Sequence, residues 1–365
     1  MTTIQLRAPI SEKLASRENN LNALRLIAAV LVLFSHCYAL SGNIQLEPIG
    51  RLLHIFDGGA LAVIAFFFLS GYLISSSWAS TPHFPSFMAK RALRILPGLA
   101  VVVAISALLL GPIASSLDIN HYFSSGQAFR YIRDNVNVLS LKTNTLPGVF
   151  EDLPIPHAVN GSLWTLKVEF LVYIATGVIG ATCLLPTEGK GWRSILFTTV
   201  MLYLAVRMIT VTKAEFNSWN TGLDLFSCQL IGVFILGAIV CTVRHWIPRS
   251  VLLVTGLISL TYLLRETSLF LLFIYLSYGY FLLFVATSSF HLLGKRTRIN
   301  DYSFGVYIYA FPIQQIMVTL APGISPVSLF LFSLPIVTLF AIASWHFIEK
   351  PCLGLKVLYG LEPAK

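Results

Sequence analysis

Charged residues are scarce in this sequence. Only 11% of its 365 residues are Asp, Glu, Lys or Arg, whereas 56% are hydrophobic, and the mean hydropathy is +0.77. A soluble globule needs more polar residues than this to cover its surface. The shortage of charge therefore excludes a water-soluble domain and indicates that most of the chain is surrounded by lipid.

Several chemical signatures are also absent. The cysteines are Cys37, Cys183, Cys228, Cys241 and Cys352, and they form no C-x-x-C pair, which argues against a zinc site or a disulfide framework. The sequence has no G-x-x-x-x-G-K-[ST] loop, no H-E-x-x-H and no G-x-S-x-G elbow. We therefore expect no metal and none of ATP-driven transport, zinc proteolysis or serine hydrolysis.

The formal net charge of +9 does not come from a dense basic stripe. The Lys and Arg residues stand singly along the chain, unlike the clusters that bind nucleic acid. We expect no nucleic-acid partner, and we expect the lipid bilayer to explain where these charges lie.

Long apolar runs fill most of the sequence. Because a helix of roughly 20 apolar residues crosses the hydrocarbon core, we predict an all-α integral membrane protein with a bundle of about ten transmembrane helices. The predicted spans are 24–40, 60–78, 93–117, 164–186, 194–212, 225–243, 250–264, 268–290, 302–320 and 327–348.

The basic residues predict an orientation for these spans. An even number of spans puts both termini on one side, and cytoplasmic segments carry the excess of Lys and Arg. If both termini are cytoplasmic, the basic residues of the outer segments are Arg51, Arg130, Arg133, Lys142, Lys213 and Arg265. Most of the others then lie inside, so we predict that both termini are cytoplasmic.

We expect one membrane domain. A cytoplasmic tail at 1–23 precedes the transmembrane domain at 24–350, and a second cytoplasmic tail covers 351–365. One long external loop, 118–163, interrupts the domain. Because structureless loops of this length are uncommon without a role, we interpret it as a substrate-facing cap, with a passive connection as the alternative.

The first predicted span contains two ionisable residues, Arg25 and His36. Such groups are costly inside a membrane and mark candidate functional sites. Their separation puts them about 20° apart around a helix and about 16 Å apart along it, so both project from one face. A neutral histidine near the bilayer midplane can take a proton from a hydroxyl and return it. The alternative is a buried imidazole that only bonds a neighbouring helix.

The third span begins with the pair Arg91 and Arg94, which share a helix face at i and i+3. Guanidinium groups fit phosphate well, so this pair suits a phosphorylated donor such as a nucleotide-containing thioester. A positive-inside anchor or a site for lipid headgroups explains the same spacing.

The fourth span carries Glu169 more than a turn inside an interfacial Trp164. A carboxylate at that depth needs a partner, and His36 is one candidate, which Glu169 would orient and stabilise in its charged form. The alternative partners are Arg25, Lys167 and Arg207. A purely structural ion pair is a further interpretation.

Four residues are candidates for substrate contact. Trp164 and Lys167 lie in the first turn of the fourth span, and His54 and Asp57 flank the outer entrance to the second. A solvated turn is the alternative for the latter two. In the second span, Ser70 and Gly71 follow a bulky aromatic run, which suits close helix packing as well as a substrate tunnel.

Five motifs follow one another over nearly the whole chain. They are Asn22-Ala23-Leu24-Arg25 with His36, Phe67-Phe68-Leu69-Ser70-Gly71-Tyr72, Arg91-Ala92-Leu93-Arg94 with Pro97, the segment from Asn160 to Glu169, and Tyr302-Ser303-Phe304-Gly305-Val306-Tyr307 with Trp345 to Pro351. As an ordered set they resemble the membrane-bound acyltransferase type-three family of bacterial surface-polysaccharide O-acyltransferases.

The resemblance implies an enzyme of the bacterial inner membrane. Such an enzyme takes an acyl group from cytoplasmic acetyl-CoA or another acyl-CoA. It passes the group to a hydroxyl of an extracytoplasmic or lipid-linked carbohydrate, such as exopolysaccharide, with a polysaccharide-assembly complex as a partner. Carried over, His36 resembles the catalytic histidine, Arg25 its motif partner, and Arg91 and Arg94 the contacts to the coenzyme. Glu169 falls in a characteristic segment, and we include it among the catalytic candidates.

Two departures from the family pattern stand out. Many members carry a histidine just before the proline that follows Tyr307, whereas this chain has Phe311 before Pro312. Others continue into a C-terminal esterase-like domain. Because the sequence ends soon after Pro351, we expect no such domain here.

Two other functions compete with acyl transfer. A proton-coupled transporter or flippase for a sugar or lipid-linked sugar would use His36 and Glu169 as a proton relay, but no internal symmetry supports it. A non-catalytic partner in an envelope complex would leave the phase relation of Arg25 and His36 unexplained.

Overall fold

The computed structural model describes residues 10, 14, 19–141, 145–182, 192–218, 224–288 and 300–358. The described chain is 77% helix and has no strands, which confirms the all-α prediction. A single isolated β-bridge joins Ser115 and Val149. Most of the predicted N-terminal tail, as well as Lys142 and Cys183, lies outside the described residues.

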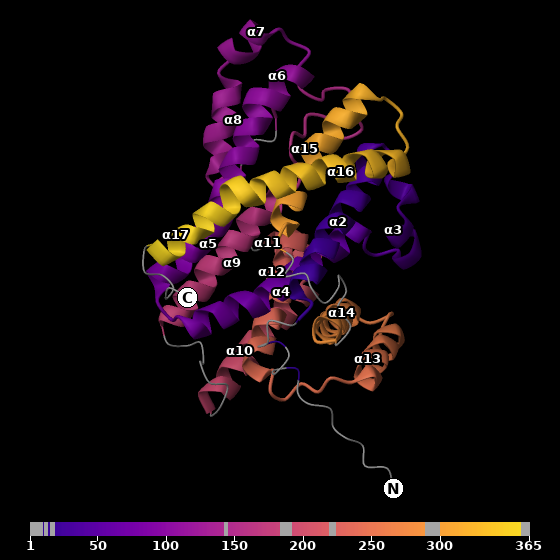
Figure 1. The fold of residues 1–365 in the computed structure, drawn as a ribbon. Coiled ribbons are helices and arrows are strands. Elements are labelled where there is room, and N and C mark those ends of the chain that lie inside the picture. Colours follow the sequence, from indigo (N-terminus) through magenta and orange to yellow (C-terminus); the bar gives the residue numbers. More distant parts are fainter. Residues whose placement is uncertain are drawn as a thin grey trace. The chain divides into compact units, whose positions relative to one another are not determined.

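Figure 1 shows the helices in chain order. They are α2 (Leu21–Leu40), η1 (Ile44–Leu46), α3 (Pro48–Leu53), α4 (Gly58–Ser80), α5 (Phe84–Ile105), η2 (Ser106–Leu110), α6 (Gly111–Ala114), α7 (Ile119–Ser124), α8 (Gln127–Val136), α9 (Trp164–Ala181), α10 (Trp192–Thr210), α11 (Lys213–Ser218), α12 (Leu225–Val243), α13 (Val251–Leu263), α14 (Phe270–Ala286), α15 (Ser303–Leu320), α16 (Pro326–Ser344), η3 (Trp345–Glu349) and α17 (Lys350–Leu358). Both η2 and η3 are π-helical turns.

Each predicted span corresponds to a helix. Among the described residues, seven helices are long and apolar enough to cross a membrane, and three shorter apolar helices match the fifth, seventh and eighth predicted spans. The total of ten crossings and the cytoplasmic placement of the termini stay predictions. The final span differs in one respect, because helical structure continues through η3 and α17 instead of ending near residue 348.

The predicted external loop is partly ordered by helices. The short helices α7 and α8 lie within residues 118–163. Tyr122 of α7 is fully buried, and its hydroxyl donates to the carbonyl of Ala107, 2.8 Å away in the π-helical turn η2. Gly111 makes room for that ring, because a Cβ at this position would lie 2.0 Å from the Tyr122 hydroxyl.

The chain divides into two compact units. The first unit comprises Met1–Arg25, Ile64–Phe87 and Val172–Arg298, and the second comprises Leu26–Val63, Met88–Leu171 and Ile299–Lys365. Several long helices therefore contribute residues to both.

In the first unit, α10 packs against α12 and α13 packs against α14 (Figure 1). The crossing of α4 and α12 depends on two glycines. A Cβ on Gly71 would lie 2.0 Å from the carbonyl oxygen of Phe234, and a Cβ on Gly237 would lie 2.0 Å from that of Phe68. Gly71 therefore serves close helix packing, one of the two interpretations of its motif.

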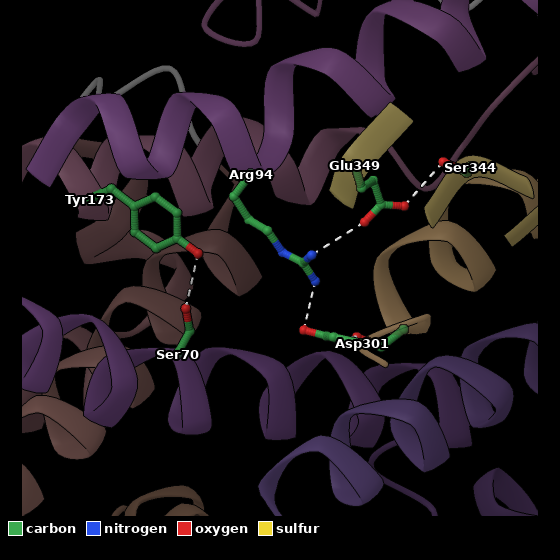
Figure 2. Close-up of polar contacts among 7 residues, drawn as sticks. Ser70, Arg94, Tyr173, Asp301, Ser344 and Glu349 are labelled. Carbon is green, nitrogen blue, oxygen red and sulfur yellow. Dashed lines mark hydrogen bonds and ion pairs between the residues drawn. The ribbon is translucent and has the colours of Figure 1, made fainter. Parts of the chain in front are cut away.

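The residue before it contacts another helix, because the Ser70 hydroxyl lies 3.2 Å from the Tyr173 hydroxyl (Figure 2).

In the second unit, α15 is the buried centre. All its residues from Ser303 to Gln315 are buried. A Cβ on Gly305 would lie 2.8 Å from the Cα of Ala341, so α15 and α16 approach closely. A Cβ on Gly98 of α5 would lie 2.7 Å from the ring of Phe304. The predicted motifs of this unit are arranged along α15.

Candidate active site

His36 lies on α2 and faces the second half of α15. Its ring packs edge-on against Phe311, with the centroids 5.4 Å apart and the planes at 83°. Its Nδ1 is buried and makes no hydrogen bond within the described part of the chain. Phe311, the residue before Pro312, thus forms one wall of the His36 site. Because no described residue bonds it, this nitrogen is a candidate to bond a substrate hydroxyl.

Arg25 belongs to the same unbroken helix as His36. The helix confirms the conformation on which their predicted shared face depends. Arg25 is half-buried. Its role in catalysis stays a prediction.

Asp57 is the carboxylate whose negative charge acts on His36. Its Oδ1 caps the first turn of α4 by accepting a hydrogen bond of 2.7 Å from the backbone of Ala60. The absence of a side chain on Gly59 lets this turn approach α2, because a Cβ there would lie 3.3 Å from both Asp57 Oδ1 and Ser35 Oγ. The sequence predicted Asp57 as a substrate contact, and the structure adds its electrostatic link to His36.

His54 stands apart from this group. It ends α3 in the left-handed conformation, with φ of 58°, and its backbone N–H donates to the carbonyl of Gly50. Its side chain is exposed. No described contact brings it to His36, so its predicted contact with substrate stays a prediction.

Gln314 connects α15 to the turn of α2 that bears His36. Its Nε2 donates to the carbonyl of Leu33 and to the Sγ of Cys37, each 2.9 Å away. Its side chain is completely buried, and its Oε1 has no hydrogen-bond partner in the described chain. Gln314 was missed by sequence reasoning, although an amide inside an apolar helix is a usable signal.

The neighbouring Gln315 holds the end of the predicted external loop. Its Nε2 donates to the carbonyls of Ile155 and Ala158, at 3.0 and 2.9 Å. Its Oε1 is likewise buried with no partner among the described residues. Two adjacent amides therefore tie α15 to the His36 turn and to the end of the predicted cap.

The segment before α9 also anchors on α15. The Asn160 amide donates to the carbonyl of Ile308 at 2.8 Å, and the Tyr307 hydroxyl lies 2.7 Å from Thr165 Oγ1 and donates to the carbonyl of Ser162 at 3.0 Å. These bonds give Asn160, Ser162 and Thr165 of the motif a structural role.

Glu169, Trp164 and Lys167 follow on α9. Glu169 is half-buried, and its negative charge acts on the Tyr307 hydroxyl. Trp164 is 40% exposed at the start of the helix, as expected of an interfacial aromatic, and Lys167 is half-buried. The negative charge of Asp57 acts on His36, and a link between Glu169 and His36 stays a prediction.

Arg94 lies at the other end of α15 and bridges two carboxylates (Figure 2). Its Nη2 is 2.6 Å from Asp301 Oδ2, just before α15, and its Nη1 is 3.3 Å from Glu349 Oε2 in η3. Glu349 is 1% exposed and also accepts a 3.0 Å hydrogen bond from Ser344 Oγ. Three motifs, those around Arg94, Tyr302 and Glu349, therefore meet at one ion-pair cluster.

Aromatic rings flank this cluster. The Arg94 guanidinium carbon lies 5.6 Å from the ring centroid of Trp345 and 5.8 Å from that of Phe304. Arg91, three residues earlier on α5, is half-buried. Sequence reasoning paired Arg94 with Arg91 but missed its acidic partners, which lie more than 200 residues away along the chain.

No group of three or more His, Cys, Asp or Glu side chains gathers into a metal site among the described residues. The sequence motifs identify two polar groups in the second unit, His36 and the Arg94 cluster. Both contact α15.

Comparisons with known proteins agree with the motifs. The family described as an acyltransferase domain matches residues 18–346. An O-acetyl transferase of Shigella phage Sf6 is 33% identical over 348 residues, which cover 92% of this chain and 96% of the relative. Nodulation protein 10 of Rhizobium leguminosarum bv. viciae is 30% identical over 169 residues, which cover 46% of this chain and 45% of the relative. No solved structure matches. The chain belongs to this acyltransferase family and is an acyltransferase enzyme with membrane-spanning helices.

Proposed function

We propose that this acyltransferase moves an acyl group, acetyl first of all, from cytoplasmic acyl-CoA to a hydroxyl of an extracytoplasmic or lipid-linked carbohydrate such as exopolysaccharide. The printed name of the phage relative, an O-acetyl transferase of nearly the same length, supports acetyl transfer to oxygen. The apolar helices and the distribution of basic residues support a location in the bacterial inner membrane with cytoplasmic termini. A polysaccharide-assembly complex remains the proposed partner.

The observation that carries the proposal is the unpartnered Nδ1 of His36. In the neutral imidazole one nitrogen accepts a proton. We propose that His36 removes the proton from the acceptor hydroxyl while its oxygen attacks the thioester carbonyl carbon. The carbon–sulfur bond then breaks, and the proton returns from His36 to the departing thiolate of the coenzyme.

Asp57 supports this role electrostatically. Its negative charge acts on His36 and stabilises the positive charge that the ring gains during proton transfer. Phe311 packs against the ring and limits its rotation. Arg25, on the predicted shared face of α2, and Glu169, on α9, are further proposed members of the catalytic site.

The donor and the acceptor are proposed to use opposite sides. Arg91 lies in the first half of α5, which carries the basic residues of that helix. A guanidinium fits the phosphates of acyl-CoA. Trp164, Lys167, His54 and Asp57 are proposed to contact the carbohydrate on the extracytoplasmic side. Gln315 orders the predicted external loop near residues 155–158.

Transfer of a radioactive label tests the function. Membranes that contain the chain are incubated with labelled acetyl-CoA, and carbohydrate is separated from coenzyme and protein. We expect label in the carbohydrate, stable to washing and released as acetate by mild base, and no label in membranes without the chain. Movement of unlabelled sugar across the membrane with no acetate incorporated would favour the transporter instead.

A further inference from the structure

We infer that Arg94 is a positioning residue that locks the start of α15 to the π-helical turn η3 and does not contact the donor phosphates, a contact that the proposed function then assigns to Arg91 alone. The role of Arg91 rests on the proposed function, because that function supplies the identity of the donor. The ion pairs of Arg94 do not depend on it.

The guanidinium of Arg94 is already engaged on two sides. Nη2 binds Asp301 at 2.6 Å and Nη1 binds Glu349 at 3.3 Å, so its fork holds two carboxylates on different segments. These carboxylates would repel the polyanionic phosphates of a coenzyme, and Arg94 could bind phosphate only by giving up one of them. Its surroundings therefore favour a clamp over an anion site.

Burial makes that exchange unfavourable. Side-chain exposure is 15% for Arg94, 14% for Asp301 and 1% for Glu349. Breaking a buried pair leaves an uncompensated charge, which is strongly destabilising. The rings of Trp345 and Phe304 flank the guanidinium.

The clamp fixes an unusual backbone turn. Glu349 closes η3, and its Oε1 accepts from Ser344 Oγ, five residues earlier, so the side chains bridge the π-helical repeat. Tyr302, beside Asp301, packs against Trp345 and His346 of that turn, with ring centroids 6.2 and 6.3 Å apart. Single π-helical turns often occur at functional sites and depend on such local support.

The clamp is connected to His36 through α15. Phe304 beside Arg94 and Phe311 beside His36 are seven residues apart, about 10 Å along one helix face. A shift of α15 at its start would displace Phe311 and hence the imidazole. A misplacement of about 1 Å can lower a rate by roughly 10²-fold, so loss of the clamp should act on kcat.

The test compares Arg91→Ala with Arg94→Ala, using acetyl-CoA and S-acetylpantetheine, which lacks all the phosphates of the coenzyme. We expect Arg91→Ala to raise the KM for acetyl-CoA about tenfold or more and to match the unsubstituted chain with S-acetylpantetheine. We expect Arg94→Ala to lower kcat by roughly 10²-fold with both donors and to change KM little. Glu349→Gln and Asp301→Asn, which keep side-chain shape, should share the kcat defect.

The opposite pattern overturns the inference. If Arg94 binds phosphate, Arg94→Ala loses its defect with S-acetylpantetheine. Glu349→Gln would then keep its kcat and lower the KM for acetyl-CoA, because a competing anion is gone.

A second readout does not need a donor. Hydrogen exchange of the peptides that cover residues 300–304 and 344–349 should accelerate in Arg94→Ala and Glu349→Gln and stay unchanged in Arg91→Ala. Equal protection in all variants contradicts the clamp. If the unsubstituted chain transfers nothing from acetyl-CoA while the exchange pattern holds, the proposed donor fails and the clamp stands.

Discussion

The two ends of α15 carry polar groups of opposite kinds. At its start, Arg94, Asp301 and Glu349 neutralise one another through ion pairs within the chain. In its second half, His36 Nδ1 and the Oε1 atoms of Gln314 and Gln315 are buried without hydrogen-bond partners among the described residues. Native proteins leave few buried polar atoms unpaired, and those they leave are often at functional sites. We interpret the first group as support for the fold and the second as the proposed substrate site.

The largest effect is expected for His36→Ala, at the end of α15 where buried polar atoms have no described partner. General acid–base catalysis contributes about 10²–10⁴-fold, so we expect the rate of acetyl transfer to fall by that factor. Cys37→Ala is the matched control, because Cys37 is the next residue of α2 and its side chain bonds Gln314. It should keep most of its rate. Transfer by His36→Ala at the rate of the control would remove His36 from the mechanism.

The ion pairs at the start of α15 should contribute more to the stability of the protein than the unpaired groups do. Arg94→Ala leaves the buried Glu349 without its cation, and we expect the free energy of unfolding, measured by reversible SDS titration, to drop by about 3–5 kcal/mol. Adding Glu349→Gln removes the orphaned charge, so the double variant should be destabilised by less than the sum of the single effects. Strict additivity of the two changes would mean that the residues do not interact.

Asp57→Asn tests whether the negative charge that acts on His36 contributes to catalysis. Asn still caps α4 through Ala60, but the negative charge that acts on His36 is lost. We expect kcat to fall about fivefold, equivalent to about 1 kcal/mol of lost attraction in the transition state. Glu169→Gln provides the comparison. A larger fall in kcat for Glu169→Gln than for Asp57→Asn would reverse our choice of the carboxylate that serves His36.

The smallest expected effect concerns the predicted external loop. Gln315→Leu leaves the carbonyls of Ile155 and Ala158 without their donor, so the loop should loosen and the KM for the carbohydrate acceptor should rise about threefold. In Gln314→Leu the bonds to α2 are lost instead, and kcat should change rather than the acceptor KM. Identical kinetic defects in both variants would show that the two amides do not serve separate sites.

Local patterns predicted much of this fold. Apolar runs located a helix for every predicted span, and the spacing of Arg25 and His36 anticipated one unbroken helix. The three shorter helices show the limit of the approach, because hydropathy locates an apolar segment but does not decide whether it spans the membrane.

Pairing between distant segments was harder to predict. Spacing put Arg94 beside Arg91, but its partners Asp301 and Glu349 depend on which helices become neighbours in space. The same reason explains why the sequence suggested Glu169 as a partner for His36 and gave no indication of the electrostatic link between His36 and Asp57. Chain order alone does not determine which carboxylate of another segment lies near a given residue.

Sidedness of transfer tests the whole account most directly. Sealed inside-out and right-side-out vesicles that contain the chain are given labelled acetyl-CoA in the external solution, with His36→Ala vesicles as the control. We predict that inside-out vesicles, whose cytoplasmic face is outside, transfer label to carbohydrate on the lumenal side and that right-side-out vesicles do so only after permeabilisation. Transfer from external acetyl-CoA by intact right-side-out vesicles, or equal transfer by His36→Ala vesicles, would contradict the account.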